Sequence, residues 1–130
     1  MPKYRNFLVI EDDKSSAFLI KLLLRELDVV ESISFAAHGE EGLDYLVRLK
    51  ANGGRCPEYI FLDLNMPVMG GFEFIKKCRQ LGCVDETQTT IIVLTSSMYG
   101  KDIQQARELS ITHYLNKPIS EEEILRVLGA

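Results

Sequence analysis

The stretch YIFLDLNMPVMGG (residues 59–71) joins an apolar run to a single acid and then to a turn rich in proline and glycine. Residues 59–62 have the length and composition of a strand that is buried on both faces of a sheet. Asp63 follows this run directly and precedes Leu64. Because an unpaired acid at the end of a buried strand is costly, we interpret Asp63 as a candidate functional residue.

Four further segments predict strands. Residues 7–10 (FLVI) stop at the acids 11–13, and residues 91–94 (IIVL) stop at Thr95. Residues 29–35 are rich in β-branched side chains, and residues 111–115 form a fifth, shorter apolar segment. Like residues 59–62, the first two are near-continuous apolar runs, which is typical of strands covered on both faces.

Apolar residues with helical spacing separate these strands. The predicted helices carry the apolar sets Ile20, Leu23, Leu24 and Leu27; Leu43, Leu46 and Val47; Phe74, Ile75, Cys78 and Leu81; and Ile103 and Ala106. A last helix begins after Ser120, which forms a capping box with Glu123. Five strands that alternate with five helices predict an α/β fold: a (βα)5 doubly wound, five-stranded parallel sheet with helices on both faces.

Length, composition and charge exclude several classes of protein. The 130 residues fit one domain, and 46% hydrophobic residues are enough for a core, so disorder is excluded as the main state. A net charge of −4 gives no electrostatic footprint for nucleic acid, and no apolar run reaches the length of a membrane span. The 3 cysteines, an odd number without CxxC spacing, favour neither a disulfide framework nor a zinc site and fit a reducing cytoplasm.

Polar residues stand where the predicted strands end. In open α/β sheets the ligand crevice lies beyond the carboxyl ends of the strands. Glu11 and Asp12 follow the first strand, Asp63 the third and Thr95 the fourth, and Lys117 follows the fifth. Converging carboxylates repel one another unless a cation intervenes, and Mg²⁺ commonly joins one or two carboxylates to a phosphate. The pattern therefore predicts a site for Mg²⁺ and a phosphoryl group, in which a carboxylate can act as nucleophile.

Each of these residues also has an ordinary structural interpretation. An acid after a strand is commonly a helix N-cap, a role that Asp12 or Asp13 can fill for the first helix. Thr95 alone suits a cap or turn, and Lys117 alone suits a solvated surface. The conjunction of five such residues on successive strand ends favours the functional interpretation.

Four motifs resemble those of the receiver domain of two-component response regulators, and the resemblance spans essentially the whole chain. They are residues 7–13 (FLVIEDD), 60–71 (IFLDLNMPVMGG), 91–97 (IIVLTSS) and 114–118 (YLNKP), in the family's order. The resemblance implies a flavodoxin-like sheet with strand order 2-1-3-4-5. It also implies that residues 1–130 are a single, stand-alone receiver domain without an output domain.

By this resemblance Asp63 would be the phosphoacceptor. Glu11 and Asp12 would be the acidic pair for Mg²⁺, with Asp12 a direct ligand and Glu11 acting through water. Asn65 would give its backbone carbonyl to the ion. Gly71 matches the family's turn glycine, for which we expect a positive φ angle.

The resemblance further implies a switch. Thr95 and Lys117 would each contact a phosphoryl oxygen, and the Lys117–Pro118 bond would be cis. Tyr114 would turn from exposed to buried and remodel the surface of the fourth helix, fifth strand and fifth helix, where a downstream protein would bind. Asn65 and Ser97 stand where the family tunes dephosphorylation.

The function implied is that of a cytoplasmic signalling protein rather than an enzyme. It would take a phosphoryl group from a sensor histidine kinase or a histidine phosphotransfer protein, as a monomer or weak dimer, without contacting nucleic acid or inserting into a membrane. Alternatives are an unphosphorylated adaptor, a flavodoxin-like electron carrier and a hydrolase. The acids 11–13 disfavour a flavin phosphate, and Asn65 stands where such a hydrolase needs a second acid.

Overall fold

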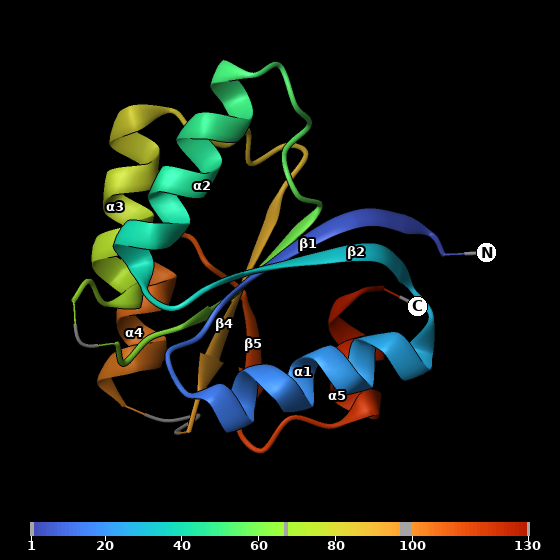
Figure 1. Ribbon diagram of the computed structural model, residues 1–130. Coiled ribbons are helices and arrows are strands. Elements are labelled where there is room, and N and C mark those ends of the chain that lie inside the picture. Colours follow the sequence, from blue (N-terminus) through green and yellow to red (C-terminus); the bar gives the residue numbers. More distant parts are fainter. Residues whose placement is uncertain (1, 67, 97–99, 130) are drawn as a thin grey trace.

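A five-stranded parallel sheet with helices on both faces forms the molecule (Figure 1). The computed structural model describes residues 2–66, 68–96 and 100–129. The elements are β1 (Tyr4–Ile10), α1 (Lys14–Leu27), β2 (Val30–Ala36), α2 (Gly39–Ala51), β3 (Tyr59–Asp63), α3 (Gly71–Leu81), β4 (Thr90–Thr95), α4 (Lys101–Glu108), β5 (His113–Asn116) and α5 (Glu121–Val127). The strand order β2-β1-β3-β4-β5 confirms the predicted (βα)5 fold.

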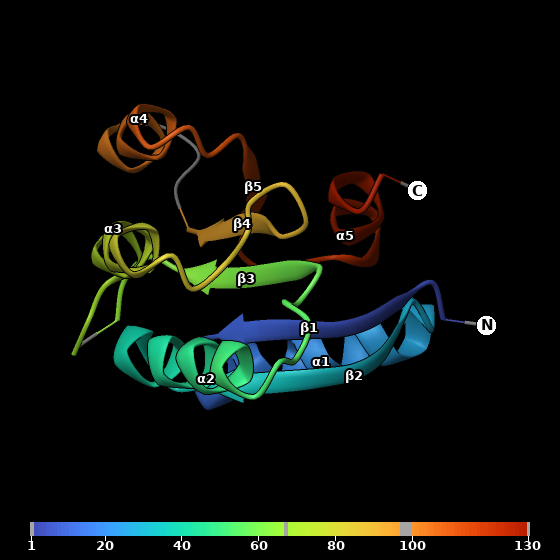
Figure 2. The same cartoon turned by 90° about the horizontal axis from the view of Figure 1, so that it is seen from above.

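The sheet separates two hydrophobic cores. Figure 2 shows α1 and α5 on one face of the sheet and α2, α3 and α4 on the other. Because neighbouring side chains of a strand point to opposite faces, Phe7 and Val9 pack with α1 and α5, whereas Leu8 and Ile10 pack with the other helices. All four side chains are fully buried, which explains why their segment is apolar without alternation.

Local hydrogen bonds explain where the elements begin and end. The Asp13 carboxylate accepts the Ser15 N–H (3.4 Å) and the Ser16 hydroxyl (2.8 Å), so Asp13 is the N-cap of α1. The fifth strand begins at His113, two residues later than predicted. The reason is that the Ile111 N–H donates to the Ala106 carbonyl (2.8 Å) and closes the end of α4.

No helix in the described ranges 2–66, 68–96 and 100–129 is long and apolar enough to cross a membrane. The longest helix, α1, has 14 residues.

Gly71, the first residue of α3, allows close packing against the end of β3. A Cβ atom there would lie 2.8 Å from the Asp63 carbonyl oxygen and 2.9 Å from the Leu64 Cα. The expected positive φ angle at Gly71 is wrong, because its φ lies outside the left-handed region. The residue is needed for a close backbone approach, which fixes the loop that follows Asp63.

We predict that Gly71→Ala lowers the free energy of unfolding by about 1–3 kcal/mol, because backbone atoms cannot yield as a flexible side chain can. Gly70→Ala is the matched control, since its Cβ would meet only the Leu64 carbonyl oxygen, at 3.3 Å. Urea denaturation of the two variants measures the difference. Equal losses at the two positions would contradict the close-approach explanation.

Candidate functional site

The carboxyl ends of the strands bring together side chains that are far apart in the sequence. Asp63 ends β3 and Thr95 ends β4, and Glu11 and Lys117 directly follow β1 and β5. Glu11 and Asp63 are each 5% exposed and Thr95 is 1% exposed, whereas Asp12 is exposed. The predicted convergence of these residues on one rim therefore agrees with the structure.

Lys117 holds the two buried carboxylates through its ammonium group. Its Nζ lies 2.7 Å from Glu11 Oε1 and 3.5 Å from Asp63 Oδ1. Burial disfavours the charged lysine, but the hydrogen bond to Glu11 and the charges of both acids outweigh it and raise the pKa of Lys117. The lysine therefore stays protonated and balances one of the two negative charges.

The surroundings of Asp63 disfavour the ionised form of its carboxyl group. Burial is the main cause that raises its pKa to about 7, followed by the hydrogen bond and charge of Glu11. Lys117 and the Asn65 N–H, which donates to Asp63 Oδ1 (3.3 Å), act in the opposite direction. The lysine alone thus leaves Asp63 partly protonated near neutral pH, and a further cation would favour its ionised form.

The acids offer a ligand set for a hard divalent cation. One carboxylate oxygen each from Glu11, Asp12 and Asp63 lies within 4.8 Å of the other two. Oxygen ligands from a few carboxylates, with remaining positions left to water, suit Mg²⁺, and the exposed Asp12 keeps one side of the cluster open to solvent. The donor set and the raised pKa of Asp63 both fit such an ion. Asn65 lies in the loop directly after β3, and its predicted carbonyl contact stays a prediction.

Thr95 and Lys117 are linked through the backbone. The Lys117 N–H donates to the Thr95 carbonyl (2.8 Å), and Thr95 pairs with Asn116 in the sheet. The Lys117–Pro118 bond is cis, as expected. A displacement of either side chain toward a new ligand would therefore act on the same junction of β4 and β5.

Tyr114 lies on β5, away from the acidic rim. Its half-buried ring packs against the core on the α2–α4 face, and its hydroxyl donates to the Ile111 carbonyl (3.1 Å). Its own carbonyl accepts a hydrogen bond from Arg126 of α5 (3.3 Å). Tyr114 thus contacts the turn that closes α4 and the last turn of α5, and its switching role stays a prediction.

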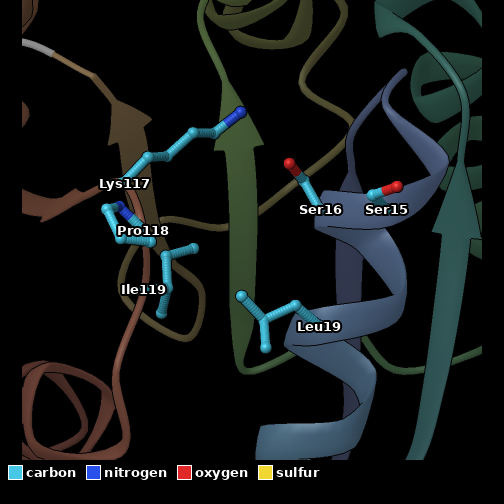
Figure 3. A pocket seen from close by; sticks show the side chains of 6 residues that line it. All are labelled: Ser15, Ser16, Leu19, Lys117, Pro118 and Ile119. Carbon is cyan, nitrogen blue, oxygen red and sulfur yellow. The ribbon is translucent and has the colours of Figure 1, made fainter.

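A pocket of about 350 Å³ opens beside the rim, between α1 and the loop after β5 (Figure 3). Its lining residues are Ser15, Ser16, Leu19, Lys117, Pro118 and Ile119. Figure 3 shows the Lys117 ammonium directed toward the end of β3, and the Ser16 hydroxyl on the facing side. The acidic rim therefore continues into a cleft with apolar walls.

Sequence reasoning missed one contact in the site. Lys117 was expected to contact a phosphoryl oxygen, and its ion pair with Glu11 was not foreseen. The available signal was an acid and a lysine at the ends of strands that share one sheet. Ser97 lies outside the described residues.

The fold and the rim define a class of protein: a doubly wound α/β domain whose third strand ends in a buried aspartate, in surroundings that favour the binding of a cation. The family description "response regulator receiver domain" matches residues 7–129. The chain therefore belongs to the receiver domains of two-component response regulators.

Individual relatives agree with this assignment. The chain is 33% identical to the probable methanogenesis regulatory protein FilR2 of Methanothrix harundinacea, over 93% of this chain and 77% of that protein. A two-component response regulator from Cytophaga hutchinsonii superposes with a TM-score of 0.88 at 27% identity, covering 98% of this chain and 96% of that one. Chemotaxis protein CheY4 of Vibrio cholerae gives a TM-score of 0.77 at 29% identity, covering 97% of both chains. The chain spans less than half the length of several other curated relatives.

We predict that, without divalent cations, the unfolding free energy of the wild type falls relative to Asp63→Asn as pH rises from about 4 to about 7. The folded-state pKa of Asp63, about 7, lies above its ordinary value of 3.8, so the folded protein binds the extra proton and loses that advantage as pH rises. At pH 8 we expect Asp63→Asn to be more stable by on the order of 1–2 kcal/mol, after allowance for solvent screening.

Chemical denaturation of both proteins at several pH values in a chelator measures this difference. Adding Mg²⁺ at pH 8 is the control, because it is expected to stabilise the wild type more than Asp63→Asn. If the difference in unfolding free energy between the two proteins does not change with pH, the raised pKa of Asp63 is contradicted.

Proposed function

We propose that the chain is a phosphoacceptor response regulator that takes a phosphoryl group on Asp63 from a phosphohistidine, with Mg²⁺. The observation that carries the proposal is the surroundings of Asp63: a buried carboxylate 3.5 Å from a lysine ammonium and within 4.8 Å of two further carboxylates. This arrangement favours the binding of a divalent cation and then of an anionic phosphoryl group. A purely structural aspartate needs no such surroundings.

The transfer would be a nucleophilic substitution at phosphorus. An oxygen of the ionised Asp63 forms a bond to phosphorus while the phosphorus–nitrogen bond of phosphohistidine breaks, and the imidazole nitrogen keeps the electron pair. Mg²⁺, held by Glu11, Asp12, Asp63 and the Asn65 carbonyl, would neutralise charge on the phosphoryl oxygens. Thr95 would donate its hydroxyl to one oxygen, and Lys117 would leave Glu11 for another.

The response to phosphorylation would follow from the link between Thr95 and Lys117. The phosphoryl group adds roughly 1.5–2 negative charges and three acceptor oxygens, which draw the hydroxyl and the ammonium inward. The junction of β4 and β5 moves with them, and Tyr114 changes its position beside Ile111. The surface of α4, β5 and α5 is thereby remodelled for a downstream protein.

Receiver domains interact with histidine kinases or phosphotransfer proteins and with downstream targets. For this chain we propose that the phosphodonor protein covers the rim and the pocket lined by Leu19, Pro118 and Ile119, because these apolar side chains flank the route to Asp63. The net charge of −4 supports a protein rather than nucleic acid as partner. The 3 free cysteines support a place in a reducing compartment, the cytoplasm.

The first test is chemical phosphorylation. Incubation with Mg²⁺ and acetyl phosphate is expected to add the mass of one phosphoryl group to the wild type, because the buried Asp63 lies beside the Lys117 ammonium and is the acid that the lysine compensates less closely than Glu11. Asp63→Asn is expected to show no such addition, and omission of Mg²⁺ to slow it strongly. Intact-protein mass spectrometry measures all three.

Asp44→Asn is the matched control, because Asp44 is an exposed aspartate on α2, remote from the rim. It should be labelled like the wild type. An unlabelled wild type would reject the phosphoacceptor function and favour the unphosphorylated adaptor.

The second test concerns the output surface. In the presence of Mg²⁺ and acetyl phosphate, amide hydrogen exchange is expected to change in peptides from α4, β5 and α5, since the phosphoryl group biases the junction of β4 and β5. Peptides from α2 serve as the internal control, and Asp63→Asn should show no change. A fully phosphorylated protein with unaltered exchange over α4, β5 and α5 would place the output surface elsewhere.

A further inference from the structure

Two cysteine thiols meet at the end of α3, remote from the acidic rim. Gly82 adopts a φ angle of 61°, and its N–H donates to the Arg79 carbonyl (3.3 Å). The Cys83 N–H donates to the Cys78 carbonyl, also at 3.3 Å. These two bonds form a Schellman motif, in which the residue after the glycine packs against the residue five positions earlier. Here those two residues are both cysteines.

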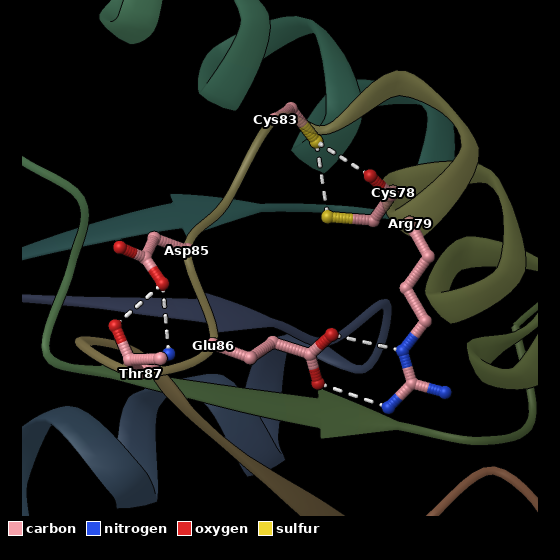
Figure 4. A network of polar contacts seen from close by, with 6 residues as sticks. All are labelled: Cys78, Arg79, Cys83, Asp85, Glu86 and Thr87. Atoms are coloured by element: carbon pink, nitrogen blue, oxygen red, sulfur yellow. Dashed lines mark hydrogen bonds and ion pairs between the residues drawn. The ribbon is translucent and has the colours of Figure 1, made fainter.

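The two sulfur atoms are in direct contact (Figure 4). Cys78 Sγ lies 3.0 Å from Cys83 Sγ, and Cys83 Sγ also lies 3.6 Å from the Cys78 carbonyl oxygen. A disulfide has an S–S distance of roughly 2.05 Å, so the sulfurs need to approach by only ~1 Å. Because both residues belong to one hydrogen-bonded turn, this approach requires no rearrangement of the sheet.

The surrounding contacts hold this turn in place. Arg79 and Glu86 form a two-pronged ion pair with both N···O distances at 2.9 Å (Figure 4). The Lys50 ammonium donates to the Gly82 carbonyl (2.6 Å) and joins α2 to the same turn. The thiols are thus held together before any reaction occurs, which removes much of the entropic cost of pairing them.

Cys83 can be reached from solvent although the two side chains are buried. It lines a pocket of about 130 Å³ that Lys50 and Cys56 also line. This volume admits a molecule of the size of water or hydrogen peroxide. Cys83 is among the residues that line this pocket and Cys78 is not, so a small reagent in the pocket meets Cys83 first.

The two thiols differ in acidity. The hydrogen bond with Cys78 lowers the pKa of Cys83, and the Lys50 charge acts in the same direction. The hydrogen bond with Cys83, followed by burial, raises the pKa of Cys78. Cys83 therefore suits the role of attacking thiolate, and Cys78 that of the second thiol.

We propose that Cys78 and Cys83 form a modification site for a peroxide, the chemical class of two-electron oxidant that the pocket admits, and that the product is an intramolecular disulfide. The Cys83 thiolate attacks one peroxide oxygen, the O–O bond breaks, and the departing hydroxide takes a proton to become water. Cys78 then gives up its proton and attacks the sulfenic sulfur of Cys83. The S–O bond breaks, a second water leaves, and the S–S bond forms. In total, two thiols and one hydrogen peroxide give one disulfide and two waters.

The test uses the reduced full chain and hydrogen peroxide in small excess. We expect the free thiols to fall from 3 to 1, the mass to decrease by two hydrogens, and a reductant to reverse both. Digestion without reduction should yield a peptide pair linked through Cys78 and Cys83. A disulfide that includes Cys56, a disulfide between two chains, or a thiol count that stays at 3 would overturn the proposal.

Variants separate the two roles. Cys78→Ala should stop at a sulfenic acid on Cys83 that dimedone captures, whereas Cys83→Ala should consume no peroxide at Cys78. Cys56→Ser is the matched control and should form the disulfide as the wild type does. If peroxide oxidises Cys78 in the Cys83→Ala variant as fast as it oxidises the wild type, and dimedone captures the product on Cys78, the assignment of Cys83 as the first thiol to react is overturned. The peptide map of the wild type decides the pairing independently of how well the variants fold.

Discussion

The ion pair between Lys117 and Glu11 controls what the rim of the sheet can hold. Glu11, Asp12, Asp63 and Lys117 together carry a formal charge of −2 when all are ionised, from three acids and one lysine. The lysine lies nearer to Glu11 (2.7 Å) than to Asp63 (3.5 Å), so Asp63 is the less well compensated acid. A divalent cation would balance the remaining charge and free Lys117 from its structural role. In the function proposed here the same ammonium would serve the resting site and a bound phosphoryl group at different times.

The parallel sheet makes this pairing possible. In the observed register Asp63 lies beside Leu94, and Thr95 beside Asn116, so that the polar residues follow one another along a single edge. A shift of one residue in any of these strands would turn its side chains to the opposite face and bury the acid in a core. Residues 7–10 of β1, 60–62 of β3 and 91–94 of β4 are apolar and buried, so an unpaired charge is costly there and the functional groups are confined to the carboxyl ends of the strands.

The fold was largely predictable from the sequence because its buried strands are apolar runs that stop at polar residues. The convergence of Glu11, Asp12, Asp63, Thr95 and Lys117 on one rim was predictable for the same reason, since strand ends in a parallel sheet share an edge. The start of β5 was misplaced because Ile111 is apolar and buried in the core but lies before the strand, with its N–H bonded to the Ala106 carbonyl at the end of α4. At Gly71 the residue type was recognised but the cause was wrong, because a close approach between two backbones depends on tertiary packing.

The thiol pair shows a different limit of sequence reasoning. Cys78 was placed on the apolar face of a predicted helix, and the chemistry of the cysteines was judged only by their number and by the absence of a CxxC motif. A glycine that closes a helix in the left-handed conformation brings together the residues on either side of it at a spacing of five. Two cysteines at that spacing around such a glycine are therefore in contact by local geometry alone, whatever the rest of the fold.

The two sites lie at opposite ends of β4, and this arrangement keeps their chemistries apart. The thiol turn leads into the amino end of the strand, where the buried Thr89 hydroxyl donates to the Pro57 carbonyl (2.6 Å) and the Thr90 N–H to the Glu58 carbonyl (2.9 Å). Thr95 ends the strand at the acidic rim, with a fully buried apolar run between the two ends. Closing an S–S bond moves two sulfur atoms by ~1 Å within a turn already anchored by Arg79 and Lys50. A movement of this size within an anchored turn has a buried, closely packed strand between it and Thr95, so we expect phosphorylation and thiol oxidation to act as separate modifications of one domain.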